Sequence, residues 1–259
     1  MAAPELRILT DENEVAREAA EFLAWLAEQA QSTGAPFRVA LAGGSTPRRL
    51  YETLAGPVFR KQVDWSSVEF YFSDERCVPP AHSESNYRMA EETLLRPIGA
   101  KPEQVFRMPG EIENPDVAAQ QYESLIRRQL NAAAPSWPRF HLILLGLGDD
   151  GHTASLFPHA ETLREPSRAV VGSRSPKGVQ NRLTFTLPLI NHAEAVVFTV
   201  TGAGKGPAVK AVLQDDSTDP TRYPAKLIDP HQGRLLWFLD PSAAQELDSV
   251  KKQITYEEE

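Results

Sequence analysis

The sequence predicts an α/β fold, with a doubly wound, mostly parallel sheet flanked by helices on both faces. Short apolar runs of strand length alternate with amphipathic stretches of helix length along nearly the whole chain. Polar or glycine-rich turns follow several of the apolar runs, as happens at the carboxyl ends of parallel strands. No low-complexity linker or internal repeat divides the chain, so we expect residues 1–259 to form a single α/β domain.

Capping residues mark where the expected helices begin. Asp11 and Asn114 are good N-caps, Thr46 stands as an N-cap directly before a proline, and Gly34 is a typical helix stop. The expected helices cover residues 11–32, 47–55, 86–96, 115–133 and 205–214, and a further C-terminal helix follows Asp240-Pro241.

The expected strands are short runs of apolar residues. The run over 140–145 is the central one, because it leads directly into the most distinctive turn of the chain. Residues 73–85 are expected to form a long loop. The other strands are expected at residues 37–42, 68–72, 169–172, 182–187, 195–201 and 235–239.

Composition excludes several classes of function. The net charge of −8 argues against non-specific nucleic-acid binding. Cys77 is the only cysteine, so an internal disulfide and a zinc–cysteine cluster are both excluded. No apolar stretch reaches the length of a membrane span and no signal peptide is evident, so we expect a cytoplasmic protein without a membrane partner.

The turn over residues 146–152 carries the clearest chemical signal. His152 lies in a glycine-rich turn after the central strand, with Asp150 two positions before it. A carboxylate beside an imidazole is the usual way to build a general base near neutral pH. The turn also matches a dinucleotide-binding fingerprint, but Asp149 and Asp150 would repel a pyrophosphate, and residues 169–174 lack the acidic residue that such a site needs.

A second glycine turn predicts a phosphate cradle. Gly43 and Gly44 allow the backbone to approach an anion, and Ser45 and Thr46 lead into a helix whose free N–H groups would point at it. The alternative is an ordinary strand-to-helix turn. Because the carboxyl ends of parallel strands share one edge of a sheet, this turn and the His152 turn are expected to converge.

Four further residues are candidates for contacting the substrate: Asp74, Arg76, Arg182 and Lys205. The three cations would bind a phosphate or a developing oxyanion. The alternatives are that Arg76 pairs with Asp74 or Glu75 within its own loop and that Lys205 is simply solvated. No two histidines have the spacing of metal ligands on a helix, so neither a metal nor a cofactor is expected.

Together these motifs resemble the 6-phosphogluconolactonase family, in the family's order and over about residues 5 to 250. The run from Gly146 to Pro158 is the most specific of them. The matching segments are Leu41–Pro47, Ser73–Arg76 with Ser85–Tyr87, Gly146–Pro158, Asn181–Thr184 with Thr186–Pro188, Pro224–Leu227 and Leu236–Asp240.

The resemblance implies a Rossmann-like fold and hydrolysis of 6-phospho-D-glucono-1,5-lactone, the second step of the oxidative pentose phosphate pathway. Its partner would be the small phosphosugar lactone, and the protein would be a monomer or homodimer. Glucosamine-6-phosphate deaminase is similar in fold, but it has a glutamate after the histidine, where this chain has Ser155-Leu156-Phe157-Pro158 and no carboxylate. A sugar-phosphate sensing domain of a transcription regulator is a third alternative, although such proteins carry a helix-turn-helix that is not evident here.

Overall fold

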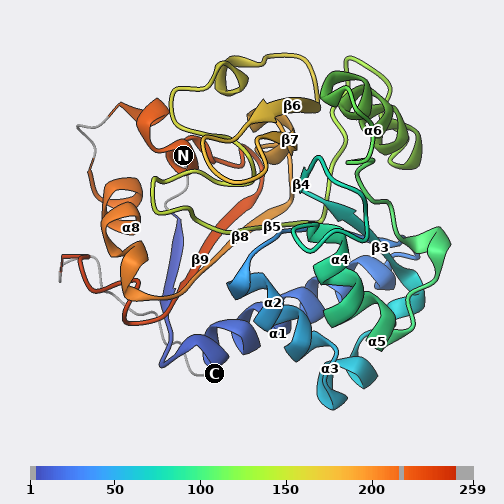
Figure 1. Ribbon diagram of the computed structural model, residues 1–259. Coiled ribbons are helices and arrows are strands. Elements are labelled where there is room, and N and C mark those ends of the chain that lie inside the picture. The colour runs from blue at the N-terminus through green and yellow to red at the C-terminus, as the bar shows by residue number, and fades with distance from the viewer. Residues whose placement is uncertain (1–3, 216–218, 249–259) are drawn as a thin grey trace.

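The computed structural model describes residues 4–215 and 219–248. A six-stranded sheet, parallel throughout and ordered β1-β9-β8-β5-β2-β3, forms the centre of the molecule (Figure 1). The expected fold class is therefore confirmed. The strands of this sheet are β1 (Glu5–Ile8), β2 (Phe37–Leu41), β3 (Val68–Phe72), β5 (Leu142–Leu145), β8 (Ala195–Val200) and β9 (Arg234–Leu239).

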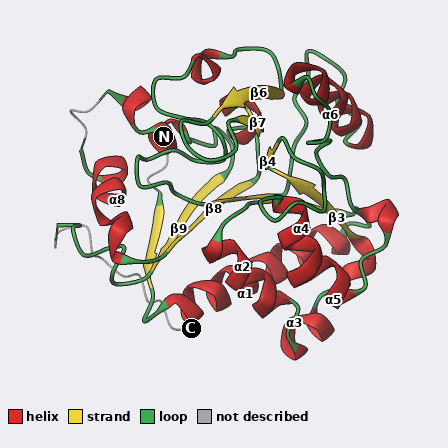
Figure 2. Cartoon of the chain, in the orientation of Figure 1, coloured by secondary structure: helices red, strands yellow, loops and turns green. Residues whose placement is uncertain are grey.

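The helices lie around this sheet, and α1 to α5 lie on one side of it (Figure 2). In residues 4–215 and 219–248, no helix combines the length and apolar character needed to cross a membrane. A π-helical turn joins α4 to α5 within the helical segment expected over 86–96. The helices are α1 (Glu12–Ser32), α2 (Ser45–Leu54), α3 (Pro57–Gln62), α4 (Asn86–Ala90), α5 (Arg96–Ile98), α6 (Pro115–Gln129), α7 (Leu187–Ile190) and α8 (Gly206–Leu213).

A second, antiparallel sheet of three strands lies on the side of the main sheet opposite α1 and α2, and α6 packs against it (Figure 1). Its strands are β4 (Asp74–Arg76), β7 (Asn181–Phe185) and β6 (Val170–Arg174). The strands expected at residues 169–172 and 182–187 thus belong to this second sheet and not to the main one. Strand β4 lies within the loop expected over residues 73–85. The physical reason is the connection between β6 and β7, because residues 175–180 are too few for the crossover that a parallel pair requires.

Three other expectations need correction. The edge strand β1 was not predicted, because four residues are too few for a clear pattern. Helix α2 begins at Ser45 with Gly44 as its N-cap, so Thr46 is not the cap. Residues 241–247 form turns instead of a helix, although Asp240 does accept a hydrogen bond from the N–H of Ala243. Any C-terminal helix after residue 248 lies outside the described residues.

The caps of the two longest helices are confirmed. The Asp11 side chain accepts hydrogen bonds from the N–H groups of Asn13 and Glu14, and Gly34 after α1 has a φ of 77°. The Asn114 side chain caps α6 in the same way, although α6 ends at Gln129, four residues before the expected end. These side chains satisfy N–H groups that have no partner within the helix.

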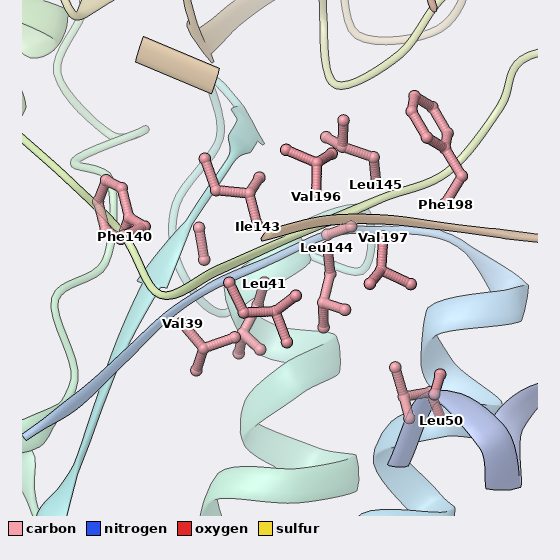
Figure 3. Close-up of a cluster of buried hydrophobic side chains, with 14 of the residues drawn as sticks. Val39, Leu41, Leu50, Phe140, Ile143, Leu144, Leu145, Val196, Val197 and Phe198 are labelled. Carbon is pink, nitrogen blue, oxygen red and sulfur yellow. The ribbon is translucent and has the colours of Figure 1, made fainter. Parts of the chain in front are cut away.

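The core lies on both faces of the main sheet. Side chains of successive residues alternate between the faces, so Val197 lies on the side of Leu50 from α2, whereas Val196 and Phe198 lie on the opposite side (Figure 3). All four residues of β5 and all six of β8 are buried. Strands buried on both faces are continuous apolar runs, which is why these two were predictable from the sequence.

Strands β2 and β5 are neighbours, and the order of strands reverses between them. From β2 the chain proceeds outward to β3, whereas β5 lies on the other side of β2 and leads through β8 to β9. Loops that leave such a switch point diverge and open a crevice at the carboxyl ends of the strands. The switch point therefore lies beside the two turns that the sequence singles out.

Tyr51 of α2 fixes the start of the first turn. Its fully buried hydroxyl accepts a hydrogen bond from the N–H of Ala42 at 2.9 Å and donates one to the carbonyl oxygen of Ala42 at 2.8 Å. Both polar groups of Ala42, the first residue after β2, are thereby satisfied away from water.

We predict that Tyr51→Phe lowers the free energy of unfolding by about 1–3 kcal/mol, because it leaves a buried N–H and carbonyl unpaired. Chemical denaturation measures this change. Tyr71→Phe is the control, since the Tyr71 hydroxyl donates its hydrogen bond to the carboxylate of the partly exposed Glu69. An equal cost for the two substitutions would contradict the assigned role of Tyr51.

Candidate functional site

A cleft opens at the carboxyl ends of β2, β5 and β8, with a volume of about 220 Å3, which suits one sugar-sized molecule. The structure brings together at this cleft the four polar clusters that follow separate strands in the sequence. Asp150 and Arg182 are not in contact with the cleft. The predicted residues that line it are Gly43, Gly44, Ser45, Thr46, Asp74, Arg76, His152 and Lys205.

His152 is held by the turn after β5. Its Nδ1 lies 2.5 Å from Oδ1 of Asp150, and the same oxygen accepts a hydrogen bond from the His152 N–H at 3.1 Å. The ring also packs against Phe157, with 4.9 Å between ring centroids. Gly148 makes this possible, because a Cβ atom at that position would overlap the His152 ring.

The state of Asp150 decides which nitrogen of His152 is free. The hydrogen bond from His152 lowers the pKa of Asp150 to about 2, against the opposing effect of partial burial. Asp150 is therefore ionised at neutral pH and can only accept hydrogen bonds. Nδ1 of His152 must carry the proton, so in the neutral ring Nε2 keeps a lone pair that is available to act as a base.

The turn after β2 presents an open helix N-terminus to the cleft. Gly44 has a φ of 110°, a conformation that favours glycine, and no side chain caps the N-terminus of α2. A Cβ atom at Gly43 would overlap the amide of Asn86, another residue of the cleft wall. The Thr46 hydroxyl lies 2.9 Å from that of Thr201, which joins this turn to the end of β8. Such an N-terminus favours a bound anion.

Lys205 brings a positive charge to the same end of the cleft. It follows Gly202, whose φ of 96° bends the chain after β8, and its side chain is partly buried. Its ammonium group lies 2.6 Å from Oδ1 of Asp149 in the turn that also holds His152. The sequence did not predict this ion pair, because Asp149 and Lys205 lie 56 residues apart.

Asp74 lies buried at the wall of the cleft. Its carboxylate accepts hydrogen bonds from the Asn86 amide at 3.0 Å and from the Ser155 hydroxyl at 2.6 Å. Asn86 and Ser155 belong to the motifs of the sequence but were not predicted as site residues. Each of the two hydrogen bonds is made to a different oxygen of the Asp74 carboxylate. Asp74 thereby connects β4 to α4 and to the segment after His152.

Glu75 stabilises the loop before α4 and does not line the cleft. Its buried carboxylate accepts from the Ser85 hydroxyl and from the N–H groups of Arg76, Asn86 and Tyr87. Burial raises the pKa of Glu75, and the three N–H groups oppose that shift. Glu75 thereby fixes the start of α4, which carries Asn86.

The two arginines have different surroundings. Arg76 lines the cleft and donates to the carbonyl of Glu84 at 2.7 Å. Arg182 lies opposite Arg76 on β7 and is 8% exposed. Burial lowers the pKa of Arg182, and the neighbouring charge of Arg76 adds to that effect. Arg182 is not among the residues that line the cleft.

Comparison with known proteins gives consistent results. Residues 10–237 match the family model described as glucosamine-6-phosphate isomerases/6-phosphogluconolactonase. The chain is 43% identical to a 6-phosphogluconolactonase of Synechocystis sp. over 223 residues, which are 86% of this chain and 87% of that protein. The 6-phosphogluconolactonase structure from Leishmania guyanensis matches with a TM-score of 0.84 and 29% identity, over 96% of this chain and 100% of the other. A monomeric glucosamine-6-phosphate deaminase matches in fold, with a TM-score of 0.75 and 19% identity over 93% of this chain and 99% of the other.

We predict that Gly148→Ala displaces the His152 ring from Asp150, so that the neutral ring loses its preference for a proton on Nδ1. The 15N chemical shifts of the imidazole report this preference directly. Gly204→Ala is the control, since a Cβ atom there meets no other atom within 4 Å. An unchanged preference in Gly148→Ala would show that the glycine is not needed for this contact.

Proposed function

The chain belongs to the family of glucosamine-6-phosphate isomerases and 6-phosphogluconolactonases, and we infer that it is a lactonase of that family. It is a hydrolase that opens 6-phospho-D-glucono-1,5-lactone to 6-phosphogluconate, in the pentose phosphate pathway. We also propose that it works in the cytoplasm, as a monomer or homodimer, without a nucleic-acid or membrane partner.

The observation that carries this proposal is the position of His152, which lines the same cleft as an open helix N-terminus and Lys205. A single base is sufficient for lactone hydrolysis, because water is the nucleophile. The deaminase alternative needs a carboxylate after the histidine. Phe157 lies against the His152 ring in that region, and Leu156 is fully buried.

In the proposed reaction, Nε2 of His152 removes a proton from a water molecule as the water oxygen attacks the lactone carbonyl. Asp150 orients the ring and stabilises the imidazolium that forms. When the tetrahedral intermediate collapses, the bond to the ring oxygen breaks and His152 returns its proton to that oxygen. The product has a hydroxyl and a carboxylic acid, which releases its proton to solvent to become the carboxylate, so no group remains on the protein.

The reacting substrate has negative charge at two places, the phosphate, which is charged throughout, and the oxyanion, which develops during the reaction, and we assign the cations to them. Arg76 lies beside Asp74 on the wall of the cleft, where its guanidinium would stabilise the oxyanion of the intermediate. Lys205 and the N–H groups of Ser45 and Thr46 would bind the phosphate. Arg182 is assigned to neither, because it is a buried residue of β7 that is not among the residues lining the cleft.

We predict that His152→Ala lowers kcat by about a hundredfold or more, the usual contribution of a general base. The affinity for 6-phosphogluconate should change little, which calorimetry can verify. The lactonase rate must be measured against spontaneous hydrolysis of the lactone. His159→Ala is the control, because the His159 side chain is 62% exposed and bonds to Thr221 away from the cleft. A near-normal kcat in His152→Ala would place the base elsewhere.

We predict that Lys205→Ala lowers kcat/KM for the phosphorylated lactone by about ten- to a hundredfold, as expected for one charge-assisted contact to phosphate. The kcat/KM for unphosphorylated gluconolactone should be much less affected and low in both proteins. The measurement is kcat/KM for the two lactones on each protein. Equal losses on both would contradict a phosphate-binding role for Lys205.

A further inference from the structure

Lys205 already has an anionic partner in the free protein. The Asp149 carboxylate lies 2.6 Å from its ammonium group and joins the turn after β5 to the turn after β8. The two side chains differ in exposure: that of Asp149 is 79% exposed, whereas that of Lys205 is 29% exposed. Asp149 is not part of the cleft lining, so it reaches Lys205 from the rim.

We propose that Asp149 competes with the phosphate of the substrate for Lys205: Asp149 occupies Lys205 in the free enzyme, and the phosphate displaces it on binding. This inference rests on the proposed function, because it concerns the same site. A phosphate near pH 7 carries a charge of about −1.5 to −2, more than one carboxylate, and it presents more acceptor oxygens. It can therefore take the lysine from Asp149, whereas an uncharged sugar cannot.

The exposure of Asp149 makes this exchange easy. Once released, the carboxylate regains full hydration, so the cost of breaking the pair is small, as for other exposed ion pairs. The displaced carboxylate still repels the bound phosphate from the rim. Both effects lower the affinity for every phosphorylated ligand, including the product, and so favour product release.

A second lysine of the same region provides the matched comparison. Lys210 of α8 pairs with Asp248 at 3.3 Å, and the Asp248 side chain is 70% exposed. Neither Lys210 nor Asp248 lines the cleft. Asp248→Asn therefore removes the same charge from a similar exposed pair, away from the phosphate-binding residues.

The experiment measures the dissociation constants of 6-phosphogluconate and of inorganic phosphate by calorimetry. Asp149→Asn should tighten both by about two- to fivefold, the equilibrium equivalent of an exposed ion pair. The KM for the phosphorylated lactone should fall with them, while that for unphosphorylated gluconolactone stays the same. The tightening should shrink as salt is added, because salt screens exposed charges. Asp248→Asn should leave the dissociation constants unchanged.

A double variant isolates the role of the lysine. In a Lys205→Ala background, Asp149→Asn should change the phosphate affinity much less, because no lysine remains to be freed. Weaker or unchanged binding in Asp149→Asn would overturn the proposal, and so would an equal effect of Asp248→Asn or a full effect without Lys205. If the wild-type protein binds phosphate but does not hydrolyse the lactone, the proposed function fails, while tighter phosphate binding by Asp149→Asn still supports this inference.

Discussion

The side-by-side pairing of β2 and β5 is the constraint on which the site depends. Because the strand order reverses between them, the chain leaves their carboxyl ends in opposite directions and cannot fill the space above them. β8, the neighbour of β5, ends at the same edge and brings Lys205 there. The proposed base and the proposed phosphate-binding groups thus follow three adjacent strands of one sheet.

Close packing behind these turns explains why glycine occupies Gly43 and Gly148. At each position, a Cβ atom would overlap a side chain that lines the cleft, Asn86 in one case and His152 in the other. The backbone can therefore approach these side chains more closely than any other residue would allow. Glycine is needed at Gly44 for a different reason. A Cβ atom there would have room, but the positive φ of this residue favours glycine.

The sequence predicted the features that depend on local patterns. Buried strands such as β8 are continuous apolar runs, and caps such as Asp11 act on the next few residues, so both are visible within a short window. The pairing of β4 with β7 was missed because it joins positions far apart in the chain, such as Asp74 and Thr184. The same holds for the contact of Ser155 with Asp74 and for the burial of Arg182, which appeared in the sequence as one more available cation.

An acidic protein that binds an anionic substrate must attract it with positive groups close to the binding site. With a net charge of −8, the chain as a whole repels a phosphosugar, so attraction must come from groups within a Debye length of the bound phosphate, about 8 Å at physiological salt. In the proposed site, the uncapped N-terminus of α2 and Lys205 would provide that attraction. Asp149, which pairs with Lys205, would reduce it. A site that binds both a phosphorylated substrate and a phosphorylated product gains turnover only if the product can leave, so a carboxylate that competes for the lysine is consistent with rapid exchange at this cleft.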